Sequence, residues 1–424
     1  MIENQEITFD PAGHAYSSRF DDIFYNPDHA SEKSNHVFLK QNNLPERFSD
    51  HSIFTIIETG FGVGLNLLMT WKSFESAPST GHLHYVSIER YPLSKEQMAK
   101  ALKPFEDDPV FAPKIKRLLE QYPLRIEGPH RIWLSDDITL TLIFDDGLRA
   151  LSKINTLADA WYLDGFSPDK NPDMWSEEIF GQMTRLSHKE TTLATYTVAG
   201  SVRRGLDNNN FSVEKVSGFG RKNHVLKGKS LTKHPRPSHK KPNTVAVIGA
   251  GLAGSSTAYA LSRYGIKISV YDRAEDPASG ASAKRTGLIN PKPSVGPTVT
   301  GTLSTIGYDL LLRTIFDLQK NPENKGLIDF QPTGNLHLVT DRKKQIKYEK
   351  LILDGRFHRD HMDHLSRKEA CEISGVTCPS DAIFYPDAGQ ASPAGLTHVY
   401  LDGSTVNYNF NNEVELIGKE EITL

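Results

Sequence analysis

A glycine-rich turn in the first part of the chain has the composition of a nucleoside-binding turn. It begins at Glu58 (ETGFGVG), directly after an apolar run, and its glycines are Gly60, Gly62 and Gly64. Glycines at alternate positions remove Cβ atoms, so a ligand can lie against the bare backbone at the carboxyl edge of a sheet. Glu89 ends the next apolar run, where a carboxylate can accept hydrogen bonds from both hydroxyls of a ribose.

Acidic residues also end the third apolar run, TLTLIF. Asp145 and Asp146 follow it, and a carboxylate here can accept a hydrogen bond from the amino group of an adenine. A plain structural turn would explain the glycines alone, but three successive strand ends that carry suitable groups favour S-adenosylmethionine as the ligand. We therefore predict that this ligand is bound by Glu58, Gly60, Gly62, Gly64, Glu89 and Asp146.

The fourth strand end, WYLDGFSP, is where a methyl group would meet its acceptor. Methyl transfer to an amine is an in-line displacement, so an enzyme mainly has to position a neutral amine. Asp164 can hold that amine and accept its proton, while Phe166 packs beside the acceptor or the sulfonium. Two other interpretations stay open, in which Asp164 is a helix N-cap and Phe166 is a core residue.

A second glycine-rich turn, GAGLAG, follows the apolar run Thr244–Ile248 and opens a helix. Gly249 makes the tight turn, Gly251 lets a pyrophosphate approach the backbone, and Gly254 lets helix and strand pack closely. Asp272 ends the following strand, where it can bind a ribose. This set predicts a dinucleotide site, although the glycines alone do not choose between FAD and NAD.

Strands and helices alternate around these turns. The predicted strands are Ile53–Glu58, Leu83–Glu89, Leu140–Phe144, Ala160–Asp164, Thr191–Thr197, Thr244–Ile248 and Ile266–Tyr271. The predicted helices are Leu65–Trp71, Glu177–Leu186 and Ala253–Tyr264. This alternation predicts an α/β fold, with parallel sheets that are covered by helices on both faces.

Six segments resemble, in order, the methyltransferase half of the MnmC family of bifunctional tRNA-modifying enzymes. They are FDDIFYN (20–26), ETGFGVGLN (58–66), WYLDGFSPDKNPDMW (161–175), TLATYT (192–197), VRRGL (202–206) and GFGRK (218–222). The resemblance covers almost all of residues 8–228 and implies a Rossmann-like fold that methylates 5-aminomethyl-2-thiouridine of tRNA to 5-methylaminomethyl-2-thiouridine, with Asp164 and Phe166 at the reaction site. One departure is SHKE (187–190), where a Pro-Gly-Gly turn is usual.

The second half resembles glycine-oxidase-like flavoenzymes, including the second half of the same family. SGASAKRTG (279–287), FQPTGNLHL (330–338) and IFYPDAGQASPAGL (383–396) carry this resemblance. It implies FAD-dependent removal of the carboxymethyl group from 5-carboxymethylaminomethyl-2-thiouridine. The FAD residues would be Gly249, Gly251, Gly254, Asp272, Ser282 and Arg285. Compared with the length of the family's chains, we expect a partial FAD domain, a truncated product or a fragment that does not complete the oxidation.

A basic stretch, residues 221–241, separates the two halves. It contains no acidic residue, and its prolines exclude a helix or a central strand from its second half. We interpret its proline-rich half as a solvated linker, and this linker can also contact RNA phosphates. We predict a methyltransferase domain at residues 1–228, a linker at 229–242 and an incomplete FAD-dependent oxidoreductase domain at 243–424. The RNA-binding residues would be Arg203, Arg204, Arg221 and Lys222.

Composition limits the location and the metal content. The net charge is −3 and 38% of residues are hydrophobic, which is typical of a soluble globular protein. We expect a cytoplasmic protein with no membrane segment, in which Cys371 and Cys378 are free thiols. The histidine-rich segment 358–364 is interpreted as solvated surface, and no metal site is expected.

Two interpretations from other functional classes stay open. One is a non-catalytic RNA- or cofactor-binding remnant, which the intact DGFSP segment disfavours. The other is an FAD-dependent oxidase of small amines with an incidental N-terminal domain, which the basic VRR and GRK clusters disfavour.

Overall fold

A computed structural model describes residues 7–9, 15–25, 29–50, 52–78, 81–220, 223–238, 241–296, 298–403 and 405–415. The chain divides into two compact units. The first contains Met1–His239 and Leu351–His358, and the second contains Lys240–Lys350 and Arg359–Leu424.

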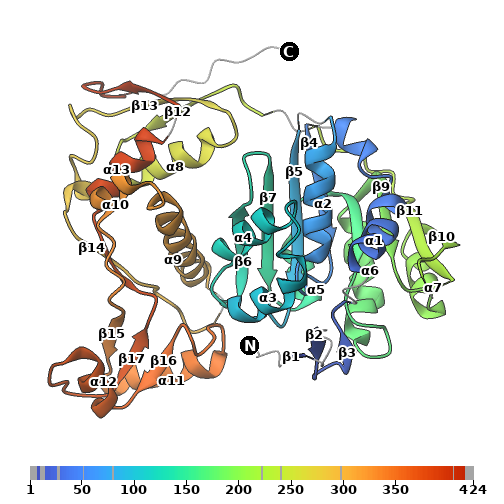
Figure 1. Ribbon diagram of the computed structural model, residues 1–424. Helices are drawn as coiled ribbons and strands as arrows, with labels where there is room; N and C mark the ends of the chain where they lie inside the picture. The colour runs from blue at the N-terminus through green and yellow to red at the C-terminus, as the bar shows by residue number, and fades with distance from the viewer. Residues whose placement is uncertain are drawn as a thin grey trace. The chain divides into compact units, whose positions relative to one another are not determined.

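The first unit is built on an eight-stranded sheet with the order β10-β11-β9-β8-β4-β5-β7-β6 (Figure 1). The strands are β4 (Ile53–Glu58), β5 (His82–Glu89), β6 (Gly128–Trp133), β7 (Ile138–Phe144), β8 (Ala158–Leu163), β9 (Ser187–Thr195), β10 (Phe211–Ser217) and β11 (His224–Ser230). The five strands from β9 to β7 are parallel, whereas β6, β10 and β11 pair antiparallel at the two edges. A separate small sheet contains β1 (Ile7–Phe9), β2 (Ala15–Ser17) and β3 (Asp22–Ile23).

Helices cover both faces of the large sheet. The helices are α1 (Ala30–Ser34), α2 (Leu65–Ser76), α3 (Lys95–Leu102), α4 (Ala112–Glu120), α5 (Gly147–Lys153), α6 (Glu177–Arg185) and α7 (Gly200–Asn208). Short 3₁₀ or π turns are η2 (Asn35–Leu39), η3 (Lys40–Asn42), η4 (Glu46–Asp50), η5 (Lys103–Phe105) and η6 (Pro172–Trp175).

Alternation along the buried strands produces two cores, one on each face. In β4, Ile56 packs in the core that contains the buried residues of α2, α3 and α4. Its neighbour Ile57 packs on the opposite face, in the core that contains the buried residues of α5, α6 and α7. Because successive side chains of a strand point to opposite faces, apolar runs without polar alternation are needed at the centre of such a sheet.

The predicted strands and helices of this unit are present, with shifts at their ends. β4 has the predicted bounds, whereas α2 continues beyond Trp71 to Ser76. The predicted parallel sheet is confirmed for the five central strands. The edge strands β6, β10 and β11, which pair antiparallel, were not predicted. The SHKE segment is not a separate turn: it forms the first part of β9, where the register with β8 shifts between Ala158 and Ala160.

The second unit contains three small sheets. β12 (Thr244–Ile248), β13 (Lys267–Tyr271) and β19 (Val406–Asn409) form a parallel sheet. β14 (Gly287–Ile289) pairs with β18 (Gly389–Ala391), and β17 (Ala382–Tyr385) lies between β15 (Asn335–Leu338) and β16 (Asp363–Leu365).

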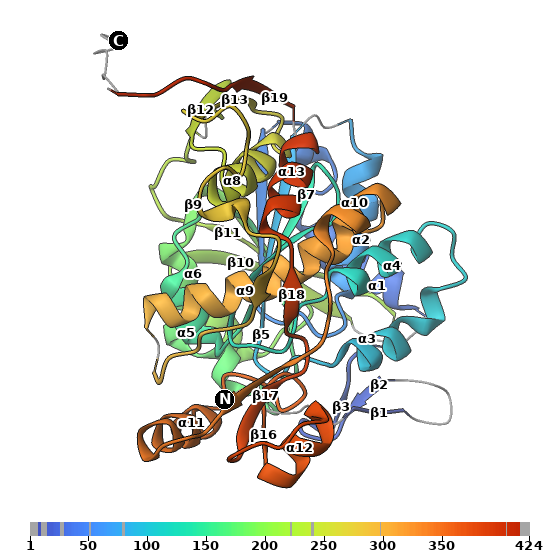
Figure 2. The same ribbon diagram turned by 90° about the vertical axis from the view of Figure 1, so that its left-hand side faces the viewer.

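The remaining helices are α8 (Leu252–Ser262), η7 (Ala281–Ala283), α9 (Val299–Leu318), α10 (Pro322–Ile328), α11 (Arg342–Asp354), α12 (Arg367–Ser374) and α13 (Pro393–Asp402). The bounds of α11 cross the division between the units. Figure 2 shows α8 beside β12, β13 and α13. The predicted strand–turn–helix–strand order from Thr244 to Tyr271 is therefore present.

The basic stretch between the units is partly ordered on the first unit. Its early residues complete β11, which ends at Ser230. Arg236 donates from Nε to Asp159 Oδ1 (2.6 Å) and from NH2 to Ile53 O (2.7 Å). The interpretation as a solvated linker was therefore wrong for Arg236, whose side chain is only 20% exposed.

None of the described helices is long and apolar enough to cross a membrane.

The histidine-rich segment differs from its interpretation as solvated surface. His358 is buried, and His361 Nδ1 lies 2.8 Å from Asp387 Oδ2. Neither residue lies in a helix, and His364 belongs to β16. Within the described ranges, no group of three or more His, Cys, Asp or Glu side chains is arranged to hold a metal ion. The two cysteines are free thiols.

Candidate active site

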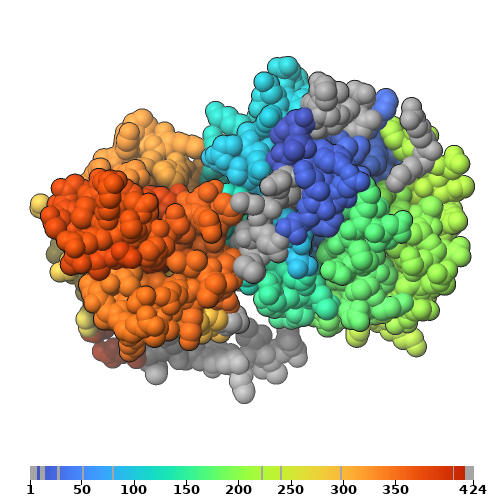
Figure 3. Space-filling model, turned by 90° about the horizontal axis from the view of Figure 1, so that it is seen from below, coloured from blue at the N-terminus to red at the C-terminus, as the bar shows by residue number. Residues whose placement is uncertain are grey.

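A cavity of about 640 Å³ lies at the carboxyl ends of β4, β5, β7 and β8. This is within the range of roughly 300–1,000 Å³ that small-ligand pockets occupy. Residues from β2 to β3 also line it, and the space-filling view shows this N-terminal part (blue) on the same face as the green segment that follows β8 (Figure 3). Its wall includes Phe20, Asp22, Phe24, Lys33, Asn66, Glu89, Tyr91, Asp146, Asp164, Phe166 and Tyr196.

The glycine turn after β4 is shaped by close backbone approach. A Cβ at Gly60 would lie 3.0 Å from Asp164 O and 3.1 Å from Gly165 Cα, so a side chain there would collide with the end of β8. Gly64 is the N-cap of α2 and has φ 75°, a conformation that favours glycine. The bare turn, the helix N-terminus behind it and the cavity in front of it fit the nucleoside and amino acid parts of S-adenosylmethionine.

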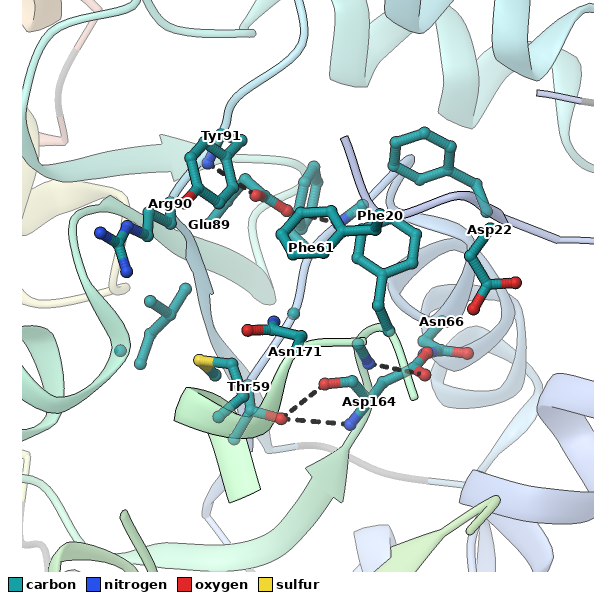
Figure 4. Close-up of a pocket in the computed structure, with 18 of the residues that line it drawn as sticks. Phe20, Asp22, Thr59, Phe61, Asn66, Glu89, Arg90, Tyr91, Asp164 and Asn171 are labelled. Atoms are coloured by element: carbon teal, nitrogen blue, oxygen red, sulfur yellow. Dashed lines mark hydrogen bonds between the residues drawn. The ribbon is translucent and has the colours of Figure 1, made fainter. Parts of the chain in front are cut away.

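Glu89 lies beside this turn, at the end of β5 (Figure 4). Its Oε2 accepts a hydrogen bond from Gly62 N (2.9 Å), and its Oε1 accepts one from Tyr91 N (2.9 Å). Burial raises the pKa of Glu89, and the backbone hydrogen bonds from Tyr91 and Gly62 oppose that rise. The carboxylate is thus fixed in the cavity wall, where its remaining lone pairs can accept from ribose hydroxyls.

The two aspartates after β7 have different surroundings. Asp145 is buried and pairs with Arg149 and Lys153. Asp146 is the N-cap of α5 and pairs with Arg90 NH1 at 3.1 Å. Both line the cavity. The carboxylate of Asp146 is thus engaged both in the helix cap and in an ion pair. Its contact with an adenine remains a prediction.

Asp164 faces the cavity at the end of β8. Its Oδ2 accepts from Asn66 Nδ2 (2.7 Å), and its Oδ1 accepts from Gly165 N (2.9 Å) (Figure 4). Its backbone is held by Thr59, whose hydroxyl donates to Asp164 O (2.8 Å). Asp164 does not cap a helix, since η6 begins at Pro172 with Asn171 as its N-cap. The alternative interpretation as a helix cap was therefore wrong.

Phe166 belongs to an aromatic group over the same cavity. Its ring stacks on Phe20 with centroids 4.4 Å apart and an interplanar angle of 19°, and Phe24 meets it edge-on at 5.5 Å. Phe166 is only partly buried and does not belong to either sheet core. The structure thus brings Asp164, Phe166, Glu89 and the glycine turn together around one cavity.

Among the residues predicted to bind S-adenosylmethionine, Glu58 does not line the cavity. It is 1% exposed, and it accepts from Asn66 Nδ2 (2.9 Å) and Ser87 Oγ (2.7 Å). Burial, and then the neighbouring charge of Asp164, raise its pKa to about 8. Glu58 therefore lies beneath the turn, and its proposed contact with the cofactor would have to be indirect.

Sequence reasoning missed several residues of the cavity wall. Asn66 connects Glu58 with Asp164, Phe20 covers Phe166, and Tyr91 lies under the guanidinium of Arg19 at 4.4 Å. Asn66 and Phe20 stand inside the ETGFGVGLN and FDDIFYN segments, so the family motifs contained the signal. Neither spacing nor residue type alone indicated their partners.

The glycine turn of the second unit has the geometry of a dinucleotide site. A Cβ at Gly254 would lie 1.8 Å from Gly249 O, so α8 and β12 can approach only with glycine there. Asp272 accepts from Ala250 N (2.7 Å) and Ala274 N (2.9 Å), and these bonds lower its pKa.

The two other predicted FAD residues lie on the loop after β13. Ser282 Oγ accepts from Leu252 N (2.9 Å) at the start of α8 and lies next to Gly251, whereas Arg285 is exposed. The turn therefore fits a pyrophosphate, and contacts with FAD remain predictions.

The predicted RNA-binding residues are only partly described. Arg203 and Arg204 are exposed on α7. Arg221 and Lys222 lie outside the described residues.

Two family models match the chain. One, S-adenosyl-L-methionine-dependent methyltransferase, matches residues 109–230. The other, FAD dependent oxidoreductase, matches residues 244–415. The order of the two matches is the order of the two glycine turns.

Curated relatives share nearly the whole chain. The tRNA 5-methylaminomethyl-2-thiouridine biosynthesis bifunctional protein MnmC of Pseudomonas putida is 36% identical over 415 residues, which are 95% of this chain and 62% of the relative. MnmC of Magnetococcus marinus is 34% identical over 93% of this chain and 60% of its own length. This chain thus spans less than two thirds of the length of these relatives.

Among solved structures, MNMC2 from Aquifex aeolicus is 21% identical, with 56% of this chain and 74% of that chain covered and a TM-score of 0.43. The resemblance inferred from the motifs is confirmed by the curated sequences. The chain is a homologue of the MnmC proteins, with a methyltransferase domain followed by a domain of the FAD-dependent oxidoreductase type.

Proposed function

We propose that the first unit is an S-adenosylmethionine-dependent methyltransferase that converts 5-aminomethyl-2-thiouridine of tRNA to 5-methylaminomethyl-2-thiouridine. One observation carries the proposal: a carboxylate, Asp164, and an aromatic ring, Phe166, meet beside a glycine turn in one cavity. The names of the MnmC relatives indicate the class of substrate.

In this proposal the residues of the cavity bind, orient and move one proton. The bound cofactor supplies an activated methyl group. Glu89 holds the ribose, and Phe166 with Phe20 borders the acceptor. Asp164 orients the amine through a hydrogen bond. The nitrogen lone pair forms the new N–CH₃ bond as the S–CH₃ bond of the donor breaks and leaves a neutral thioether, and Asp164 accepts the proton that the nitrogen loses. Asp146 would contact the adenine.

Replacing Asp164 by Ala tests this assignment. We expect the methylation rate constant at saturating substrates to fall by about 10²–10⁴-fold, the range that a general base contributes. Calorimetry should find cofactor affinity within about threefold of the parent, because Asp164 faces the acceptor. Equal methylation rates in variant and parent would remove Asp164 from the mechanism.

We propose that the second unit binds FAD. The reaction that we propose for it is removal of the carboxymethyl group from 5-carboxymethylaminomethyl-2-thiouridine. Gly249, Gly251 and Gly254 would take the pyrophosphate, Asp272 the ribose, and Ser282 with Arg285 the neighbouring loop contacts. Flavin retained after gel filtration with added FAD, and lost in a Gly251→Val variant, would support the site. Turnover of the carboxymethylaminomethyl tRNA tests the reaction separately.

tRNA would be the partner in both reactions, and both reactions would take place in the cytoplasm. The intact cavity and the match of both halves to MnmC proteins favour this proposal over a non-catalytic remnant and over an oxidase of small amines.

A further inference from the structure

Asn66 occupies a central position between two carboxyl groups. It is the second residue of α2, is 7% exposed, and lines the cavity directly behind the glycine turn. Its Nδ2 donates to Asp164 Oδ2 at 2.7 Å and to Glu58 Oε1 at 2.9 Å. Figure 4 shows its amide beside the Asp164 carboxylate.

The orientation of this amide is determined by its neighbours. An NH₂ group has two hydrogens, one for each carboxyl group, whereas a flipped amide would place its carbonyl oxygen against both of them. The carbonyl Oδ1 instead accepts a hydrogen bond from Ser34 Oγ at 2.6 Å. Ser34 ends α1 and is 2% exposed, so the acceptor side of the amide is also buried and engaged.

We propose that Asn66 is a positioning residue for methyl transfer, in which its amide, held by Ser34, fixes the carboxylate of Asp164 toward the acceptor amine. This inference rests on the proposed methyltransferase function. It extends that function by two residues, Asn66 and Ser34, that act through Asp164.

The local backbone explains why such a restraint is needed. Asp164 follows the last residue of β8 and precedes Gly165, which has φ 137°, so the chain leaves the sheet at this point. Only a fixed side chain keeps the carboxylate within reach of an amine, and a displacement of about 1 Å can lower a rate by 10²-fold.

A double-mutant cycle separates positioning from stability. In the full chain, Asn66→Ala should lower the methylation rate constant by about 10–100-fold at saturating substrates, with cofactor affinity unchanged within about threefold. Ser34→Ala alone should lower the methylation rate constant less than Asn66→Ala does. Because Ser34 acts through Asn66, the double variant should be no slower than Asn66→Ala.

Asn42 provides the matched control. It is also a buried asparagine of the first unit, whose Nδ2 donates to Phe38 O at 2.9 Å and whose Oδ1 accepts from Thr192 Oγ1 at 2.5 Å, and it does not line the cavity. Asn42→Ala should lower the melting temperature about as much as Asn66→Ala and leave the rate constant within threefold of the parent. Equal rate losses in both variants would indicate general destabilisation and overturn the proposal, as would an unchanged rate in Asn66→Ala.

A crystal structure of the Asn66→Ala variant distinguishes this proposal from the proposed function. If the parent transfers no methyl group to the tRNA, the proposed function is wrong. The positioning of Asp164 by Asn66 is still tested, because the crystal structure of the variant shows where the Asp164 side chain lies. We expect the Asp164 carboxylate to leave its parental position or to occupy more than one rotamer. A carboxylate that stays in place without Asn66 would overturn the positioning role.

Discussion

Asp164, Glu89 and Glu58 end or follow neighbouring parallel strands, yet their surroundings assign them different tasks. Asp164 lines the cavity, and its carboxylate accepts hydrogen bonds from the Asn66 side chain and from Gly165 N. Glu89 is fixed by two backbone N–H groups of the cofactor-side loops. Glu58 is buried beneath both, with a pKa raised to about 8. All three are acidic residues at or just after the end of a strand, so their contacts, and not the sequence pattern, distinguish them.

At Glu89, the structure predicts a loss of cofactor affinity. Replacing Glu89 by Ala would remove the proposed acceptor of two ribose hydrogen bonds and would also leave Gly62 N and Tyr91 N without this partner. Affinity for S-adenosylmethionine should fall by about 1–3 kcal/mol, the scale for hydrogen bonds to a charged group. Calorimetry on the full chain measures this, with Glu46→Gln, an exposed glutamate, as the control. Unaltered affinity in Glu89→Ala would place the ribose elsewhere.

At Glu58, the raised pKa predicts a pH dependence of stability. Between its ordinary value of 4.5 and about 8, the folded state keeps a proton that the unfolded state has released. The free energy of unfolding therefore falls as pH rises through this window. Glu58→Gln removes that titration while keeping an acceptor for Asn66, so its melting temperature relative to the parent should rise from pH 5 to pH 8. A difference that stays constant with pH would show that Glu58 is ionised in the folded protein.

At the scale of elements, the sequence predicted those that are apolar throughout and missed those that are half polar. β4 and β12 have the predicted bounds, because each is a mainly apolar run that leads into a glycine turn. β10 and β11 mix polar and apolar residues without a regular period, and the last two residues of β11 fall within the predicted linker at 229–242. The Asn66–Asp164 contact joins residues 98 positions apart, which no local pattern encodes.

Arg236 connects the basic stretch with the buried start of β8. Burial alone would raise the pKa of Asp159, but hydrogen bonds from His188 and Arg236 outweigh it and hold that pKa at about 2. Arg236→Ala should therefore lower the free energy of unfolding of the first unit by about 1–3 kcal/mol, because a buried carboxylate loses a charged partner.

Tryptophan fluorescence in urea measures this for one unit alone, since Trp71, Trp133, Trp161 and Trp175 all lie in the first unit. Lys233→Ala, an exposed cation on the same stretch, is the control and should leave the midpoint unchanged. If both variants unfold at the parental urea concentration, the Arg236–Asp159 pair does not contribute to stability.

At the scale of the whole molecule, a strand, a glycine turn and a helix form a site among the described residues of each unit. The net charge of the chain is −3, which provides no general electrostatic attraction for RNA. The proposed binding of tRNA would then depend on local basic groups, because phosphate neutralisation supplies much of the affinity for nucleic acids. On the described part of the chain, α7 presents two adjacent exposed arginines, Arg203 and Arg204, on the sheet face that contains the α5, α6 and α7 core.

Replacing Arg203 and Arg204 by Ala should weaken tRNA binding and reduce its salt dependence. Each lost phosphate contact removes about 0.9 from the slope of log affinity against log salt on a duplex, so the slope should flatten by about one to two units. Lys95 and Lys103 provide a matched pair of exposed cations beside the α3 residues that pack on the opposite face of the sheet, and their replacement by Ala should leave the slope unchanged. Filter binding or fluorescence anisotropy between 50 and 200 mM salt, roughly the range over which such contacts act, provides the measurement. A slope that flattens in the lysine variant and not in the arginine variant would place the tRNA on the α3 face, because counterion release follows the phosphates that the protein contacts.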